Sequence, residues 1–151
     1  MSTLTIFCGL PGSGKTTAYH KNSDTIFGGN IRLSLDEFRL LMTGKDFHAP
    51  FEPEVHMWSE RTTRYLLSQG HDVVVDATFL KKSLRAKWIE LAKECKADIS
   101  CAWMNVPASV CFLRNEKRDK KVPEEVMEKM TEDFEPPSQD EGFMEMLEFG
   151  E

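Results

Sequence analysis

The sequence predicts one α/β domain in which helices cover both faces of a parallel sheet. Short runs of β-forming apolar residues alternate along the chain with segments of helical spacing, and this alternation is typical of a parallel sheet. The run HDVVVD at 71–76 holds three consecutive valines, which suits a strand covered on both faces. A length of 151 residues is enough for one hydrophobic core, so we expect residues 1–151 to form a single domain.

The first half of the chain predicts two strands and three helices. In order, these are a strand at 3–8, a helix at 15–22, a strand at 31–34, a helix at 36–42 and a helix at 54–68. The first strand follows from the β-formers of TLTIFC, and the spacing of the apolar residues in DEFRLLM predicts the second helix. Gly70 is a suitable stop for the third helix.

The second half continues the alternation. In order, we expect a strand at 71–76, a helix at 82–95, a strand at 99–106, helices that begin at Pro107 and Pro123, and a short strand at 145–149. Proline is favoured in the first turn of a helix, and Pro136-Pro137 ends the last one. The helix from Pro107 is expected to continue into the basic segment 114–121.

Composition restricts the class of protein. Apolar residues make up 40% of the chain and charged residues 29%, as in soluble domains. No apolar stretch approaches the ~18 residues of a membrane span, and the N-terminus lacks a basic signal-peptide region. The four cysteines form no C-x-x-C pair, so we expect them to be reduced and mostly buried. These features predict a cytoplasmic protein without a membrane partner.

The net charge of −6 is unevenly distributed. Residues 124–151 contain eleven acids and one base, whereas residues 1–123 contain 18 bases and 14 acids. The part of the chain expected to hold the active site is therefore mildly basic. That charge is compatible with a nucleic-acid partner. The acidic segment is more simply explained as a solvated surface.

Residues 9–16 (GLPGSGKT) fit the phosphate-loop pattern G-x-x-x-x-G-K-[S/T] at every fixed position, between an expected strand and an expected helix. Glycines let backbone N–H groups wrap a phosphate, and the helix directs its positive end at the same anion. Lys15 supplies a charge for the β- and γ-phosphates, and the Thr16 hydroxyl is a ligand for Mg²⁺. The residues expected to bind ATP here are Gly9, Pro11, Gly12, Ser13, Gly14, Lys15, Thr16 and Thr17.

Two carboxylates follow expected strands at the edge where the phosphates bind. Asp36 follows the strand at 31–34. It is equally suited to accept a proton from an acceptor hydroxyl or to cap the next helix. Ser34 could also provide that cap. Arg39, three residues on, is either an anion clamp or a surface residue. Asp76 ends the valine-rich strand, which suits a magnesium ligand acting through water, and the Thr78 hydroxyl could face the acceptor.

Arg114 and Arg118 lie four residues apart in the basic segment expected to be helical. Arginines on a mobile flap can stabilise charge on a transferring phosphoryl group. A solvated basic helix face would give the same composition.

Together these motifs resemble the kinase domain of bacteriophage-type polynucleotide 5′-hydroxyl kinases, with zeta-toxin-like and AAA-like small phosphate-loop kinases as wider relatives. The resemblance rests on four segments: GLPGSGKTT at 9–17, SLDEFR at 34–39, VVVDATF at 73–79 and VPASVCFLRNEKRDKKVP at 106–123. It implies a three-layer phosphate-loop kinase fold with a parallel sheet of order 2-3-1-4-5 and a helical lid near 114–121.

The resemblance also implies residue roles. Asp36 would be the general base and Arg39 would bind the 3′-phosphate of the acceptor. Arg114 and Arg118 would hold the ATP phosphates from the lid. In this chain Ala77 replaces the family's usual threonine, and Thr78 stands where asparagine is usual.

The leading hypothesis is an ATP- and Mg²⁺-dependent kinase that phosphorylates the 5′-hydroxyl of DNA or RNA. Its catalytic residues would be Lys15, Asp36 and Arg118, and longer strands would contact the basic residues at 81–87 and 114–121. A kinase of a sugar, nucleoside or antibiotic is the alternative within enzymes, and a nucleotide-dependent regulatory ATPase is an alternative of another class. Asp36 with Arg39 favours a kinase, because a switch needs no acceptor site. The sequence leaves open whether the chain forms a homo-oligomer.

Overall fold

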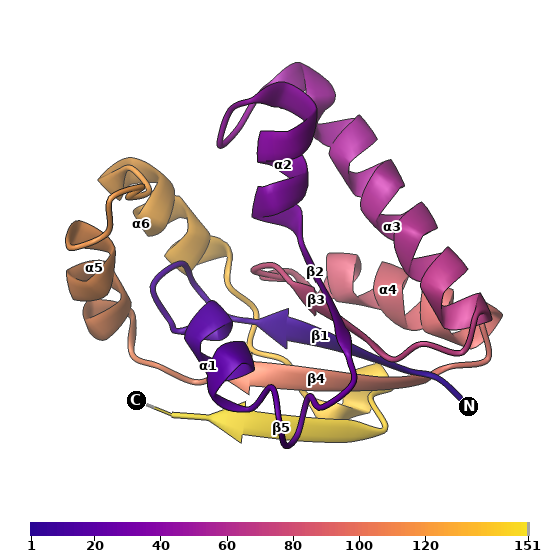
Figure 1. Ribbon diagram of the computed structural model, residues 1–151. Coiled ribbons are helices and arrows are strands. Elements are labelled where there is room, and N and C mark those ends of the chain that lie inside the picture. The colour runs from indigo at the N-terminus through magenta and orange to yellow at the C-terminus, as the bar shows by residue number, and fades with distance from the viewer. Residues whose placement is uncertain (151) are drawn as a thin grey trace.

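The computed structural model describes residues 1–150 and has a five-stranded parallel sheet at its centre (Figure 1). The strands are β1 (Thr3–Cys8), β2 (Ile31–Ser34), β3 (Val73–Asp76), β4 (Asp98–Met104) and β5 (Glu145–Phe149). Their order is β2-β3-β1-β4-β5, which confirms the predicted 2-3-1-4-5 sheet. The register pairs Ser34 with Asp76 at the carboxyl ends of two neighbouring strands.

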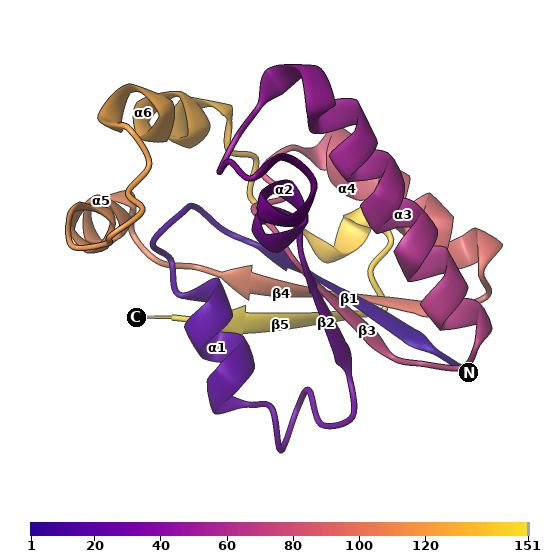
Figure 2. The ribbon, with the colours of Figure 1, turned by 45° about the horizontal axis from the view of Figure 1, so that its top comes forward.

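Helices cover both faces of the sheet, as the sequence predicts (Figures 1 and 2). The α-helices are α1 (Lys15–Lys21), α2 (Leu35–Thr43), α3 (Glu52–Ser68), α4 (Lys82–Glu94), α5 (Ala108–Glu116) and α6 (Glu124–Asp133). Two 3₁₀ turns, η1 (Ala49–Phe51) and η2 (Gln139–Glu141), precede α3 and β5. No helix within residues 1–150 is long and apolar enough to cross a membrane.

The main core lies between the sheet and the layer formed by α3 and α4. Strand residues such as Leu4, Ile6 and Val75 are fully buried there against Leu67 and Trp88 of the two helices. The other face is covered by α1 and the loop that follows it, through Ala18 and Phe27. The alternation of side chains along each strand thus supplies two apolar faces, as a sheet buried on both sides requires.

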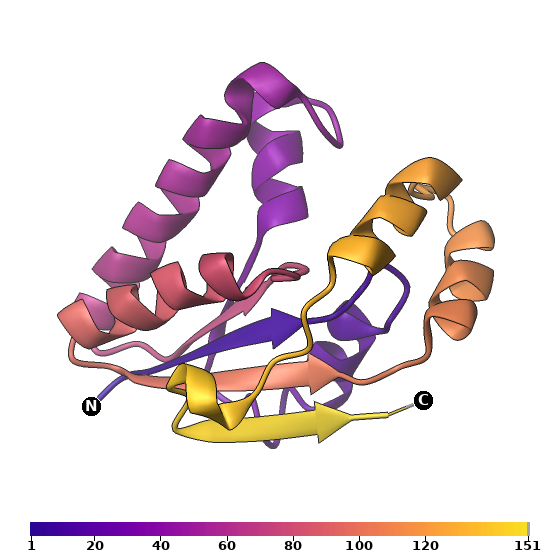
Figure 3. The ribbon, with the colours of Figure 1, turned by 180° about the vertical axis from the view of Figure 1, so that it is seen from behind.

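Helices α5 and α6 lie beyond the carboxyl ends of the central strands (Figure 3). They are joined to the body by a third cluster, in which Leu10, Val106, Cys111 and Met127 pack together. This arrangement places α5 and α6 at the edge of the sheet where the phosphate loop emerges, which is the usual ligand-binding edge of such a fold.

One residue of an expected basic surface is buried. Arg85 on α4 has no exposed side-chain area and pairs with Glu141 of η2 at 2.8 Å. Its Nη1 also donates to the Phe79 carbonyl at 2.8 Å. The expectation that the basic residues at 81–87 bind nucleic acid is therefore wrong for Arg85, because the partner carboxylate comes from a segment 56 residues away.

Candidate active site

The phosphate loop joins β1 to α1, and its glycines are needed for its shape. Gly12 has a φ of 83° and Gly14 a φ of 95°, both in the left-handed region that favours glycine. A Cβ at Gly12 would also lie 2.5 Å from the Cys111 carbonyl oxygen, so a side chain there would clash with α5. The loop conformation therefore depends on the glycines that the sequence pattern identifies.

Lys15 stands at the first position of α1 and folds back over the loop. Its Nζ donates to the carbonyls of Gly9 at 3.0 Å and Leu10 at 2.9 Å. Burial lowers the pKa of Lys15 below its ordinary value, although the nearby carboxylates of Asp76 and Asp36 oppose that shift. Two backbone carbonyls thus hold the ammonium group on the loop, and both candidate carboxylates are near enough to affect its pKa.

Ser13 has a buried hydroxyl that the protein itself does not satisfy. Within residues 1–150, Ser13 Oγ is the one buried side-chain oxygen or nitrogen without a hydrogen-bond partner. An unsatisfied buried hydroxyl is costly. Ser13 does not line the cleft that Gly12, Gly14 and Lys15 line, so its hydroxyl is not assigned to a bound phosphate.

Thr16 and Asp76 form the pair expected to hold magnesium. Thr16 Oγ1 donates to Asp76 Oδ2 at 2.9 Å, although 60 residues separate the two positions. Asp76 is only 6% exposed, at the carboxyl end of β3. A carboxylate and a hydroxyl at this edge are oxygen ligands of the kind that Mg²⁺ prefers, so the residues fit the ion.

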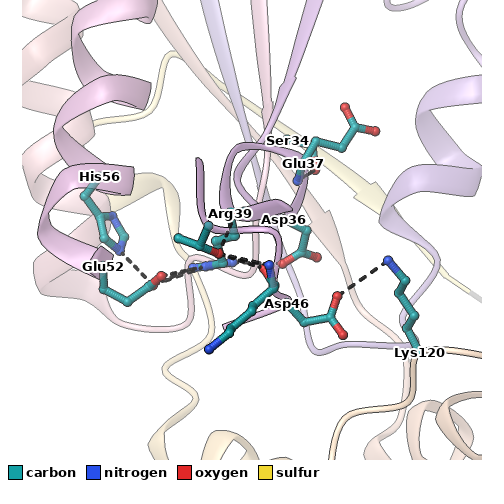
Figure 4. Close-up of polar contacts among 10 residues, drawn as sticks. Ser34, Asp36, Glu37, Arg39, Asp46, Glu52, His56 and Lys120 are labelled. Atoms are coloured by element: carbon teal, nitrogen blue, oxygen red, sulfur yellow. Dashed lines mark hydrogen bonds and ion pairs between the residues drawn. The ribbon is translucent and has the colours of Figure 1, made fainter. Parts of the chain in front are cut away.

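Asp36 and Arg39 lie in the first two turns of α2, and their side chains contact each other (Figure 4). Ser34 rather than Asp36 caps the helix, since its Oγ accepts the Glu37 N–H at 3.3 Å. The Asp36 side chain is 80% exposed, and its Oδ1 accepts Arg39 Nη1 at 2.8 Å. The capping alternative for Asp36 is thereby excluded, and its carboxylate remains accessible.

The sequence did not identify the partner of Arg39. Glu52, at the start of α3, accepts Arg39 Nε at 2.9 Å and Nη2 at 2.9 Å (Figure 4). Burial disfavours the charge of Arg39, but Glu52 and Asp36 together raise its pKa above the ordinary value. His56 Nε2 lies 3.7 Å from Glu52 Oε1, and burial lowers the pKa of His56 although Glu52 opposes that shift.

Arg114 and Arg118 approach the loop from α5 and the segment after it. Arg114 Nη1 lies 3.4 Å from the Ser13 carbonyl and 3.5 Å from that of Gly12. The expected helix through 114–121 is wrong beyond Glu116, where α5 ends. Asn115 donates to the Val122 carbonyl at 2.7 Å and accepts the Val122 N–H at 2.9 Å, which closes residues 117–121 into a loop. Arg118 is therefore a loop residue.

The loop that carries Arg118 also faces α2. Lys120 Nζ lies 3.6 Å from Asp46 Oδ1, which follows α2 (Figure 4). Both side chains are exposed, so this ion pair contributes little stability. It shows that the loop after α5 and the loop after α2 approach one another.

The predicted site residues line one cleft of about 900 Å³. Those that line it are Pro11, Gly12, Gly14, Lys15, Thr16, Thr17, Asp36, Arg39, Asp76, Thr78, Arg114 and Arg118. Gly9 and Ser13 lie behind this surface; Gly9 donates its N–H to the Thr78 carbonyl at 3.0 Å. The cleft also has an apolar wall that the sequence did not identify as part of a site; its residues are Phe79, Leu84, Trp88, Val122, Val126 and Met130.

Substitution of Arg118 by lysine is expected to lower kcat at least about tenfold. Lysine keeps the charge but lacks the planar fork that can bind two phosphate oxygens. Steady-state kinetics with saturating ATP would measure the loss. Lys117→Arg, which exchanges the same side chains at the adjacent position, is the control and should have near-parental kcat. Full activity of Arg118→Lys would contradict a phosphate-binding role.

Comparison with known proteins gives similarities at the level of family, sequence and structure. Residues 4–137 match a family model described as an AAA domain. The chain is 28% identical over 137 residues to the L-seryl-tRNA(Sec) kinase of Methanococcus maripaludis, covering 89% of this chain and 53% of that protein. It also matches a chain of the solved Pnkp1/Rnl/Hen1 RNA repair complex, with a TM-score of 0.76 and 29% identity over 87% of this chain and 43% of that chain.

These relatives are longer proteins: the chain spans about half the length of each. A match of more even length is the APS kinase CysC of Mycobacterium tuberculosis, with a TM-score of 0.66, 18% identity and coverage of 97% of this chain and 88% of that chain. At that identity the similarity shows the fold alone.

Proposed function

The chain belongs to the AAA domain family and has the fold of a phosphate-loop kinase, and from this premise we propose that it transfers the γ-phosphate of ATP to the 5′-hydroxyl of a polynucleotide. One observation carries the proposal. The Asp36–Arg39 pair lines the same cleft as Lys15, Thr16 and Asp76, and this cleft also has an apolar wall. A base, an anion clamp and an apolar surface are the groups that a nucleotide acceptor would use.

Asp36 would act on the acceptor hydroxyl. Its carboxylate accepts the proton as the hydroxyl oxygen attacks the γ-phosphorus; the bond from the γ-phosphorus to the bridging oxygen breaks and ADP leaves. Lys15 and Arg118 stabilise the charge on the phosphoryl oxygens during this transfer. Magnesium, held at Thr16 and Asp76, would supply further neutralisation of the phosphate charge.

The contacts of Arg39 suggest how an acceptor phosphate would release Asp36. Glu52 accepts hydrogen bonds from Nε and from Nη2, so the Nε–Nη2 edge of the guanidinium is fixed. Asp36 accepts Nη1 on the other side. A 3′-phosphate bound at the Nη1–Nη2 edge would replace Asp36 as the acceptor of Nη1. The Asp36 carboxylate would then be available to the neighbouring 5′-hydroxyl.

The apolar wall supports a nucleotide rather than a sugar as the acceptor. Trp88 and Phe79 are 1% exposed and belong to the main core, so the accessible apolar side chains of this wall are Leu84, Val122, Val126 and Met130. A polyol leaves its hydroxyl groups without partners against such a surface, whereas the apolar face of a base can pack against it. A gluconokinase and one other sugar kinase share the fold at 19% and 18% identity, which does not indicate the acceptor.

A second candidate is a kinase of a hydroxyl group carried by a tRNA. It is favoured by the similarity to L-seryl-tRNA(Sec) kinase, which extends over 89% of this chain. Arg39 separates the two candidates, because a serine hydroxyl has no phosphate at the position that a 3′-phosphate occupies beside a 5′-hydroxyl. A small-molecule kinase and a regulatory ATPase would likewise not require that phosphate.

The Arg39→Ala variant is expected to raise KM for a nucleoside 3′-monophosphate about tenfold to a hundredfold and to leave KM for ATP unchanged. The estimate follows from the ~1.5–3 kcal/mol of a charge-assisted hydrogen bond. Initial rates with the bare nucleoside, its 3′-monophosphate and a 5′-hydroxyl strand measure it. The control is Arg61→Ala, at an exposed arginine on α3. Equal turnover of nucleoside and 3′-monophosphate by the parent protein would exclude the clamp.

A further inference from the structure

Arg32 on β2 directs its guanidinium onto the carboxylate proposed to hold magnesium. Nε and Nη2 donate to Asp76 Oδ2 at 3.2 Å and 2.8 Å. The same oxygen accepts the Thr16 hydroxyl at 2.9 Å. One carboxylate oxygen therefore receives three donated hydrogen bonds, two of them from a cation.

Packing holds Arg32 in this position. Its side chain is 15% exposed, and its Cζ lies 5.7 Å from the centre of the Tyr19 ring on α1. Nη1 reaches outward to Glu37 Oε1 at 3.1 Å, at the start of α2. Burial disfavours the charge of Arg32, but the bonds to Asp76 and Glu37 raise its pKa, so the guanidinium stays charged. Asp76 is 6% exposed, and solvent screens this pair only weakly.

The metal site has little negative charge of its own. Residues 1–150 contain no group of three or more histidine, cysteine, aspartate or glutamate side chains that could hold a metal ion. Thr16 supplies a neutral oxygen, and the single charge of Asp76 is balanced by Arg32. Magnesium bound by one carboxylate normally obtains its other ligands from substrate phosphates and water.

We propose that Arg32 is a positioning residue that neutralises Asp76, so that a divalent metal binds only together with the nucleotide phosphates. Arg32 also holds Asp76 Oδ2 in place as the acceptor of the Thr16 hydroxyl proton, so the lone pairs of Thr16 Oγ1 would be free to bind a metal. The inference rests on the nucleotide and metal site of the proposed function, and it does not depend on which acceptor is phosphorylated.

The test is a titration with Mn²⁺, followed by electron paramagnetic resonance in the absence of nucleotide. Arg32→Met keeps an unbranched side chain over Tyr19 but removes the charge, and it is expected to bind Mn²⁺ at least about tenfold more tightly than the parent protein. Arg32→Lys keeps the charge and should bind Mn²⁺ as weakly as the parent. Adding Asp76→Asn to Arg32→Met should abolish the gain. Glu37→Gln, which removes only the exposed partner, should leave metal binding unchanged.

Unchanged or weaker Mn²⁺ binding by folded Arg32→Met would overturn the proposal, because a purely structural role for Arg32 predicts that result. A gain that persists in the double variant would also overturn it. If Arg32→Met does not fold, the same titration is made with Arg32→Gln, which keeps a hydrogen-bond donor for Asp76 but not the charge.

A last experiment adds a non-hydrolysable ATP analogue to the parent protein. Tight Mn²⁺ binding there, with no phosphorylation of any strand, would contradict the proposed acceptor and leave the role of Arg32 standing; no binding even there would overturn both.

Discussion

Lys15→Ala is expected to abolish phosphoryl transfer while the protein remains folded. The ammonium group is held on the phosphate loop by the carbonyls of Gly9 and Leu10, where it would contact the β- and γ-phosphates. One such contact is typically worth about 3–4 kcal/mol in the transition state, which is a loss of several hundredfold in kcat. Single-turnover transfer of labelled γ-phosphate measures the loss.

The fold should survive because Lys15 bonds only to two backbone carbonyls and its burial opposes its charge. Thermal unfolding of the variant checks this point. Lys21→Ala, in the last turn of the same helix, is the matched control and should keep parental activity. A folded Lys15→Ala protein with near-parental turnover would show that the phosphate loop is not used in the reaction.

Asp36→Asn is expected to lower kcat by ~10²–10⁴-fold with little change in ATP affinity. The amide keeps the size of the side chain but cannot take the proton of the acceptor hydroxyl. The helix should not be disturbed, since Ser34 provides its cap and Glu52 continues to hold Arg39. Equilibrium binding of an ATP analogue, measured together with kcat, separates a loss of proton transfer from a loss of ATP affinity.

Glu37→Gln is the matched control for Asp36→Asn, because it makes the same chemical change at the next residue of α2. Its carboxylate is 68% exposed and should be dispensable for turnover. Loss of ATP binding in Asp36→Asn would instead assign Asp36 to the metal or nucleotide site.

The sequence predicted those parts of the site that depend on local patterns. The phosphate loop is contiguous, and its glycines, Lys15 and Thr16 are placed by the strand and helix on either side. Asp36 and Arg39 share one turn of α2, and Asp76 ends a strand that its valines identify. In each case a few neighbouring residues determine whether the segment is a strand or a helix. They also determine whether the functional side chain lies at its beginning or its end.

Contacts between distant segments could not be predicted in this way. Glu52 comes from a helix that starts 13 residues after Arg39, and Arg32 meets Asp76 across 44 residues. The end of α5 depends on a side-chain bond from Asn115 to Val122, which overrides the helical spacing of the basic residues. Arg85 looked like a surface base because its partner, Glu141, lies in the acidic segment near the C-terminus.

Transfer of labelled γ-phosphate from ATP to a panel of acceptors tests the central claim most directly. The panel contains 5′-hydroxyl DNA, 5′-hydroxyl RNA, the same strands with a 5′-phosphate, a nucleoside 3′-monophosphate, seryl-tRNA and gluconate. The proposed function predicts label on the 5′-hydroxyl strands and on the 3′-monophosphate, none on the 5′-phosphorylated strands, and release of the label by a phosphatase. Label on seryl-tRNA or gluconate, with every 5′-hydroxyl strand left unlabelled, would contradict it.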